Sequence, residues 1–282
     1  MKINDFFLPT KISEAYARLK KEGNSAWLMA GGTSTAFVKS TSPKTAIDLT
    51  RLPLRGITRK SDHFRIGACA TVCDLMEYKA EGWVLDRVAR RFVNQHVRNI
   101  STLGGNISRV FYWSDFPVAL RALEGTLTMR TSKESKVKIS EAFHNMLAHR
   151  GAFKDVILEY IDVPRLTKGM GFGYSKETRT SEGFSTATVA VFVKVDKGLI
   201  SDVRIAAGSV FPFPMRFLKM EEALTGEKAE VGCIRKIDFK DLDRYALTPR
   251  EGMTLDYCKH LLKVKISDGI AQAVAEATGG SR

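Results

Sequence analysis

Two pairs of adjacent glycines are the residues of this sequence best suited to bind a charged ligand. Gly31-Gly32 follows an apolar run, and Gly104-Gly105 lies within the segment Thr102–Asn106. Adjacent glycines can adopt backbone conformations that a side chain forbids, so their N–H groups can converge on one point outside the chain, which suits an anion. Two such segments could hold the two phosphates of one dinucleotide, and for that purpose they must lie close together.

Small polar side chains flank both pairs. Thr33 and Ser34 follow the first pair and Asn106 follows the second, so they add donors where phosphate oxygens would lie. Either pair taken alone could equally be an ordinary tight turn. The shared pattern of apolar residue, two glycines and small polar residue is what favours a ligand site.

Alternating strands and helices are predicted around the first pair. The hydrophobic pattern indicates an amphipathic helix over 10–22, a strand over 26–29, a helix over 35–39 and strands over 46–49 and 64–68. The first glycine pair would therefore lie in a strand, loop and helix unit.

The predicted strands and helices no longer alternate in the rest of the chain. A helix is predicted over 84–97, and another follows Asp115 and ends at Gly125. Beyond a boundary near 164–169, three strands precede helices at about 214–225 and 256–277, which is typical of a small α+β domain. We therefore expect two domains, over residues 1–165 and 170–282.

The composition is that of a folded protein with a large positive charge. The chain has 282 residues, 44% of them hydrophobic and 27% charged, with a formal net charge of +13. Such a charge could attract nucleic acid, an acidic partner or a phosphate-bearing ligand. The basic residues are spread along the chain, without an RNA-binding or zinc-finger signature, so we expect no nucleic-acid binding.

No stretch approaches the roughly 20 apolar residues that span a bilayer, and the first residues lack the apolar centre of a signal peptide. We therefore expect no membrane span and a cytoplasmic location.

Motifs for metal and hydrolytic chemistry are missing from the sequence. The cysteines, Cys69, Cys73, Cys233 and Cys258, form no C-x-x-C pair, which suits a reducing compartment and places any iron–sulfur cluster on another chain. The 5 histidines are not clustered, and there is no Walker loop, H-E-x-x-H or G-x-S-x-G. The run Gly169–Gly173 has the wrong spacing for a Rossmann fingerprint and continues into a strand pattern.

Separate stretches of the sequence resemble one known family. They are A-G-G-T at the first glycine pair, R-N-x-x-T-L-G-G-N-I at the second, S-D-x-P-x-A-L-x-A-L after it, and residues 203–226. Together they are similar to the flavin subunit of molybdenum hydroxylases, which include xanthine, carbon monoxide and nicotinate dehydrogenases. The resemblance implies an α+β fold: a two-lobed FAD-binding domain of the p-cresol methylhydroxylase type, followed by a small domain of a three-stranded antiparallel sheet plus helices.

The resemblance also implies a function and partners. Substrate would be oxidised at a molybdenum centre on a large subunit, and electrons would pass through 2Fe–2S clusters on a small subunit to FAD on this chain, then to NAD or another acceptor. Two alternatives stay open from the residues: a stand-alone flavin oxidase, and a non-catalytic docking module that has lost FAD.

By the same resemblance, Leu28–Thr35 and Thr102–Asn106 form the two pyrophosphate loops, and Asp115 contacts the cofactor, although by position it could also cap a helix. Phe92, Leu158 and Lys176 match positions near the flavin; by residue type, Phe92 would be core and Lys176 a surface lysine. No catalytic acid or base and no metal ligand is expected. The implied FAD-binding residues are Leu28, Met29, Ala30, Gly31, Gly32, Thr33, Ser34, Thr35, Phe92, Thr102, Leu103, Gly104, Gly105, Asn106, Asp115, Leu158 and Lys176.

One segment departs from the family. Between Asn106 and Asp115 the family usually carries small residues, whereas this sequence has Phe111, Tyr112 and Trp113. Three consecutive aromatic side chains could stack on the ring system of the cofactor or pack against a partner subunit.

Overall fold

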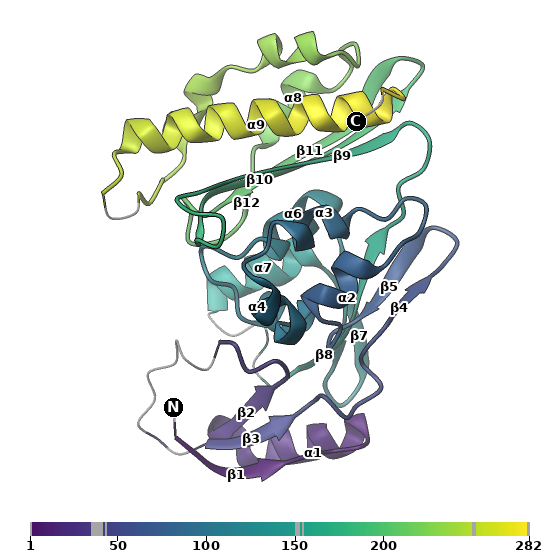
Figure 1. The fold of residues 1–282 in the computed structure, drawn as a ribbon, viewed down its shortest axis with the longest axis vertical. Helices are drawn as coiled ribbons and strands as arrows, with labels where there is room; N and C mark the ends of the chain where they lie inside the picture. The colour runs from purple at the N-terminus through teal and green to yellow at the C-terminus, as the bar shows by residue number, and fades with distance from the viewer. Residues whose placement is uncertain are drawn as a thin grey trace. The chain divides into compact units, whose positions relative to one another are not determined.

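The structure is a computed structural model that describes residues 2–34, 42, 44–149, 153, 155–249 and 252–280. Its chain divides into two compact units (Figure 1). Unit 1 comprises Met1–Lys79, Asn94–Arg109 and Glu124–Pro164, and unit 2 comprises Ala80–Val93, Val110–Leu123 and Arg165–Arg282. Short internal segments of the N-terminal half therefore belong to the unit that contains the C-terminus.

Unit 1 begins with a small parallel sheet. Its strands are β1 (Ile3–Phe7), β3 (Lys44–Asp48) and β2 (Ala26–Met29), in that order, with β1 and β2 both parallel to β3. Helix α1 (Ile12–Glu22) packs on the sheet through Ala15 and Leu19, which lie one turn apart on its apolar face. The predicted helix over 10–22 and strand over 26–29 are confirmed; the helix predicted over 35–39 lies outside the described residues.

The second sheet of unit 1 is antiparallel. Its strands, in spatial order, are β4 (Ile57–Arg59), β5 (His63–Gly67), β8 (Ile157–Pro164), β6 (Thr126–Arg130) and β7 (Glu134–Lys138). Its helices are α2 (Val72–Glu77), α4 (Gln95–Ile100), α5 (Leu103–Ser108) and α7 (Ile139–His149). Helix α5 packs against the central strand β8, and α2 packs against α4.

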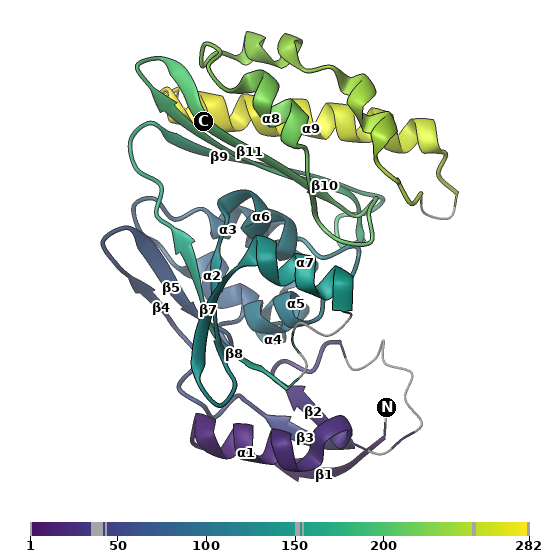
Figure 2. The same ribbon diagram turned by 180° about the vertical axis from the view of Figure 1, so that it is seen from behind.

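Unit 2 is built on an antiparallel sheet with the strand order β12 (Met215–Arg216), β11 (Leu199–Gly208), β10 (Ser185–Asp196) and β9 (Met170–Thr178). The long helix α9 (Leu255–Ala277) runs along one face in both views (Figure 1, Figure 2), with α8 (Leu218–Leu224) nearby. Helix α6 (Phe116–Leu123) packs on β10 and β11 and contacts α3 (Leu85–Arg90). The mixed α+β fold with three long antiparallel C-terminal strands is confirmed.

Close approach of β9 to α9 explains two of the three glycines in the Gly169–Gly173 run. A Cβ added to Gly171 would lie 1.9 Å from the carbonyl oxygen of Ala273, and one added to Gly173 would lie 1.9 Å from that of Gly269. These glycines therefore allow a strand to pack directly on a helix.

The single helix predicted over 84–97 is wrong. The structure has α3 and α4, and the chain between them passes from unit 2 to unit 1. The Asn94 side chain accepts a hydrogen bond from the backbone N–H of Val97 at 3.0 Å and so starts a new helix. The continuous apolar face of residues 84–97 had indicated one helix in spite of this capping residue. Phe92 therefore lies in the segment that connects the two helices.

None of the helices in the described part of the chain is both long enough and apolar enough to cross a membrane.

Candidate functional site

The first glycine pair forms an open loop directly after β2. Gly32 has φ +69°, in the left-handed region that favours glycine. Gly31 lies against the backbone of α4, where an added Cβ would be 1.7 Å from the carbonyl oxygen of Ile100. Among the described residues, the backbone N–H groups of Gly31, Thr33 and Ser34 have no hydrogen-bond partner. The loop therefore presents donors to a ligand; Thr35 lies outside the described residues.

The two glycine segments lie next to each other in unit 1, as a shared diphosphate would require. The Ser101 hydroxyl, one residue before the second segment, donates to Thr33 Oγ1 at 3.2 Å. The close approach of Gly31 to Ile100 is a second contact between the two segments. Leu28, Met29 and Ala30 lead into the first loop from β2 and are half-buried.

The second glycine pair is not an open turn, because it lies in the first turns of α5. Thr102 is the N-cap residue, and its hydroxyl accepts a hydrogen bond from the N–H of Gly105 at 3.1 Å. The N–H of Leu103 donates to Ala70, that of Gly104 to Ala68 and that of Asn106 to Thr102.

The expectation that the N–H groups of Gly104 and Gly105 converge on an anion is therefore wrong. The glycine at 104 serves close packing instead, since an added Cβ would be 2.6 Å from the carbonyl oxygen of Ala68. Asn106 donates one amide N–H to the Thr102 carbonyl at 3.1 Å, which leaves its second amide N–H for a ligand.

Arg109 is a positive charge beside these segments that the sequence analysis did not single out. Its guanidinium lies over the ring of Trp27, 5.3 Å from the ring centre, on the strand that leads to the first loop. Partial burial lowers the pKa of Arg109, but the ordinary pKa of arginine is so high that the side chain stays charged. Arg109 therefore adds a positive charge over the strand that leads into the first loop.

In unit 2, Asp115 and Lys176 form a buried ion pair. Lys176 Nζ lies 2.7 Å from Asp115 Oδ2, and each side chain is only 3% exposed. The ammonium also donates to the carbonyl of Arg91 at 3.0 Å, and the second carboxylate oxygen accepts from the Thr188 hydroxyl at 3.2 Å. Lys176 is therefore not the surface lysine that its residue type suggests.

Tyr174 lies on the same face of β9 as Lys176, two residues earlier, and is 8% exposed. Burial and the neighbouring charge of Asp115 raise the pKa of Tyr174 well above its ordinary value. Its buried hydroxyl has no hydrogen-bonding partner among the residues that the structure describes. The phenol is thus a protonated donor beside Asp115.

The remaining predicted residues occupy core positions. Phe92 is 9% exposed and its ring centre lies 5.7 Å from that of Phe116, both in unit 2. Leu158 is 4% exposed on β8, opposite Met129 of β6, in unit 1. The predicted residues therefore divide between the units: both glycine segments and Leu158 in unit 1, and Phe92, Asp115 and Lys176 in unit 2.

The aromatic segment that departs from the family forms a cluster in unit 2. Phe111 and Trp113 stack with ring centres 4.8 Å apart, and Tyr112 meets Trp113 edge-on. Phe184 adds a further ring 4.5 Å from Trp113. Tyr112 is 44% exposed and Phe184 46% exposed, so part of the cluster faces outward in the chain alone.

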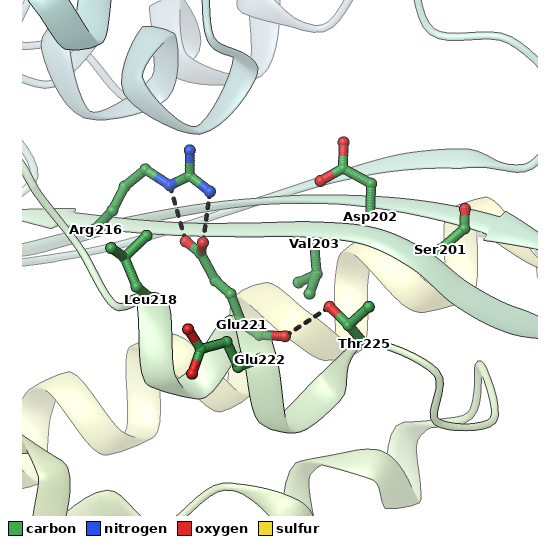
Figure 3. Close-up of a pocket in the computed structure, with 8 residues that line it drawn as sticks. All are labelled: Ser201, Asp202, Val203, Arg216, Leu218, Glu221, Glu222 and Thr225. Atoms are coloured by element: carbon green, nitrogen blue, oxygen red, sulfur yellow. Dashed lines mark hydrogen bonds and ion pairs between the residues drawn. The ribbon is translucent and has the colours of Figure 1, made fainter.

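A pocket of about 560 Å³ lies elsewhere in unit 2, lined by β11, β12 and α8, and contains none of the predicted residues. Figure 3 shows that its arginine and one glutamate face each other, with Arg216 Nε 2.9 Å from Glu221 Oε1.

The thiols and possible metal ligands suggest no further centre. The described cysteines are free, and burial together with the Asp48 charge raises the pKa of Cys69 to about 12. Over the described ranges there is no group of three or more His, Cys, Asp or Glu side chains placed to hold a metal ion.

Comparisons with known proteins identify relatives of this chain. A family model described as the FAD binding domain in molybdopterin dehydrogenase matches residues 1–166, and one described as the CO dehydrogenase flavoprotein C-terminal domain matches residues 172–238. The chain is 27% identical over 219 residues to the carbon monoxide dehydrogenase medium chain of Hydrogenophaga pseudoflava, covering 75% of this chain and 76% of that one.

It is 24% identical over 271 residues to the xanthine dehydrogenase FAD-binding subunit of Escherichia coli O157:H7, covering 93% of each. The structure is similar to that of carbon monoxide dehydrogenase from Hydrogenophaga pseudoflava, with a TM-score of 0.84, 25% identity and 98% of both chains covered.

The residues present fit FAD. In unit 1, the N–H groups of Gly31, Thr33 and Ser34, which have no partner among the described residues, suit a diphosphate, and Arg109 adds a positive charge over the strand that leads to them. The first family model covers more than half of the chain. The protein therefore belongs to the FAD-binding medium subunits of the molybdenum hydroxylase family, and it is an FAD-dependent oxidoreductase subunit.

Proposed function

We propose that this chain is the subunit through which electrons leave a molybdenum hydroxylase complex. The complex would oxidise its substrate at a molybdenum centre on a large subunit, pass electrons through 2Fe–2S clusters on a small subunit to this chain, and deliver them to NAD or another acceptor. The observation that carries the proposal is the family match over residues 1–166. Two relatives bear the names medium chain and FAD-binding subunit, which describe parts of larger enzymes.

FAD, when bound, supplies the redox chemistry, and the protein binds, orients and tunes it. In our proposal, the backbone N–H groups of Gly31, Thr33 and Ser34 bind one part of the diphosphate. The free amide N–H of Asn106 and the charge of Arg109 assist from the neighbouring segment. The second glycine pair contributes by packing α5 into place, because its own N–H groups are already hydrogen-bonded.

Unit 2 carries other residues for which we propose a role in binding FAD. The carboxylate of Asp115 would accept hydrogen bonds from ribityl hydroxyls, and Lys176 would hold that carboxylate in place through the ion pair. Phe92 and, from unit 1, Leu158 would supply apolar surface near the ring system. We keep as proposals the loop roles that the resemblance gives to Leu28, Met29, Ala30, Thr35, Thr102 and Leu103.

We also propose the domain boundaries expected from sequence, with an FAD-binding domain over 1–165 and a C-terminal domain over 170–282. The first family model ends at residue 166 and the second begins at residue 172, which supports a boundary in that interval. A cytoplasmic location stays a prediction that rests on the scattered cysteines.

Two measurements test the proposal. Titration of the purified chain with FAD should raise its melting temperature, and the bound flavin should show visible absorbance. Purification of the tagged chain from its native host should bring down a molybdenum-containing chain and an iron–sulfur chain. That complex should reduce NAD, or an artificial acceptor, with electrons from an N-heteroaromatic substrate.

A chain that shows no thermal shift and no flavin absorbance would contradict the FAD role and favour a docking module. Turnover of a small substrate by the isolated chain would favour a stand-alone oxidase. Co-purification of no partner would contradict the role as a subunit of a complex.

A further inference from the structure

A short polar row interrupts the apolar interface between α6 and the sheet of unit 2. The α6 residues Phe116, Val118 and Ala119 are fully buried there. Thr188, on the central strand β10, is also fully buried and places a hydroxyl in the same interface. Burying a hydroxyl is unfavourable unless it is hydrogen-bonded, so its partners reveal why it is there.

Thr188 stands at the centre of a chain of hydroxyl groups that ends on Asp115. Its Oγ1 donates to Asp115 Oδ1 at 3.2 Å. Its Oγ1 also lies within hydrogen-bonding distance of the Ser185 hydroxyl and 3.3 Å from the Ser209 hydroxyl. A hydroxyl has one proton and two lone pairs, so a Thr188 that donates to Asp115 can accept from both serines.

The register of the sheet places Lys176 and Thr188, the two partners of the Asp115 carboxylate, side by side. Lys176 of β9 and Gly208 of β11 lie directly opposite Thr188, so the three residues form one row across three strands. Directly opposed side chains lie on the same face of a sheet. Lys176 binds Oδ2 and Thr188 binds Oδ1, so the row holds both oxygens of Asp115 and fixes the plane of its carboxylate.

Ser209, at one end of this series of hydroxyl groups, has an unusual backbone conformation. Ser209 has φ +73°, a left-handed conformation that is unfavourable for a residue with a side chain, and it is 1% exposed. Glycine would adopt this conformation more easily, so the hydroxyl is the feature that a serine adds here. Strained conformations of this kind concentrate at functional sites.

We infer that Thr188 is a positioning residue whose hydroxyl, supported by Ser209, holds the Asp115 carboxylate in the orientation in which it binds FAD. The inference rests on the proposed function, since the contact between Asp115 and FAD belongs to that proposal. It adds Thr188 and Ser209 to the residues that support FAD binding. Both would act on the cofactor indirectly, by orienting Asp115.

The test compares full-length variants for FAD affinity, apo-protein melting and the circular dichroism of the bound flavin. Thr188→Val removes the hydroxyl and keeps the shape, Thr188→Ser restores it, and Thr186→Val is the matched control. Thr186 is 5% exposed on the same strand, and its hydroxyl donates to the Glu177 carbonyl at 3.1 Å instead of to Asp115. Ser209→Gly removes a supporting hydroxyl and relieves the left-handed backbone, so it should fold at least as well as the natural chain.

We expect Thr188→Val to weaken FAD binding about tenfold and to change the flavin dichroism, whereas Thr188→Ser stays within about twofold of the natural chain. Ser209→Gly should melt no lower than the natural apo protein and yet bind FAD about threefold more weakly. Equal loss of FAD affinity in Thr188→Val and Thr186→Val would overturn the inference. If Thr188→Val fails to fold, unchanged FAD affinity in Ser209→Gly would overturn it instead. A natural chain that binds no FAD would instead overturn the proposed function, and the inference with it.

Discussion

The glycine pairs at 31–32 and 104–105 share a local sequence pattern and differ in structure. The first is an open loop in which the N–H of Gly31 has no partner among the described residues and Gly32 is left-handed. The second begins a helix, and its N–H groups are bonded to Ala68 and to its own N-cap residue Thr102. A glycine pair can therefore serve either to expose the backbone or to let backbone segments pack closely, and only the surroundings separate the two uses.

The largest effect is expected from Gly31→Ala. A Cβ at this position would be 1.7 Å from the carbonyl oxygen of Ile100, and a backbone oxygen cannot move aside without displacing α4. We expect a loss of about 3 kcal/mol or more in the free energy of unfolding, with loss of FAD binding. Denaturant unfolding of the apo protein measures this. A variant as stable as the natural chain would mean that the two glycine segments do not pack together as the structure shows.

Gly104→Ala should cost about 2 kcal/mol, because its Cβ would be 2.6 Å from the Ala68 carbonyl oxygen. The FAD affinity of the folded protein should change less than its stability, since the N–H of residue 104 is already bonded within the protein. Gly105→Ala is the matched control: its Cβ would lie 3.0 Å from the Thr102 hydroxyl and close to no backbone atom outside its own helix, and alanine is the better helix former. A larger loss of stability in Gly105→Ala than in Gly104→Ala would contradict the close-packing role of Gly104.

Gly32→Ala should separate binding from folding. The new side chain has room, with only Met29 Sδ near at 3.8 Å, but the left-handed backbone costs about 1 kcal/mol. Relief of that strain would turn the N–H groups of the loop, so we expect FAD affinity to fall about tenfold. Isothermal titration with FAD, alongside thermal melting, measures both effects. Unchanged affinity would show that this loop does not bind the cofactor.

The smallest effect is expected from Asp74→Ala, which loosens the support of the second segment. Asp74 accepts the N–H of Thr71 at 2.8 Å and pairs with Arg55, and Thr71 is bridged to Thr102. Burial alone would raise the pKa of Asp74, but these hydrogen bonds outweigh it and lower the pKa. We expect a cost of about 1 kcal/mol at neutral pH.

The pH dependence of that cost has a definite sign. Because the pKa of Asp74 is lowered by folding, its contribution is fully present above the unfolded value of about 3.9 and is lost as pH falls through the folded pKa. The unfolding free energies of the variant and the natural chain should therefore converge in acid. A difference that grows as pH falls would contradict the lowered pKa.

Short-range signals predicted much of the fold. The helix α1 was correctly predicted from its apolar spacing, because that spacing depends only on neighbouring residues. The break at Asn94 was missed, since one capping residue outweighed a continuous apolar face. Lys176 was expected at the surface by residue type, yet a carboxylate from a distant segment makes its burial possible.

By itself, the sequence determined the family, the cofactor class and the segments that carry the glycine pairs, because these depend on residue types and their order. Tertiary structure alone decided which glycine pair keeps its N–H groups for a ligand and how the charge of Lys176 is balanced. The physical reason is that a hydrogen-bond donor or a buried charge is satisfied by whichever group folding brings within about 3 Å, and Ala68 and Asp115 come from far along the chain.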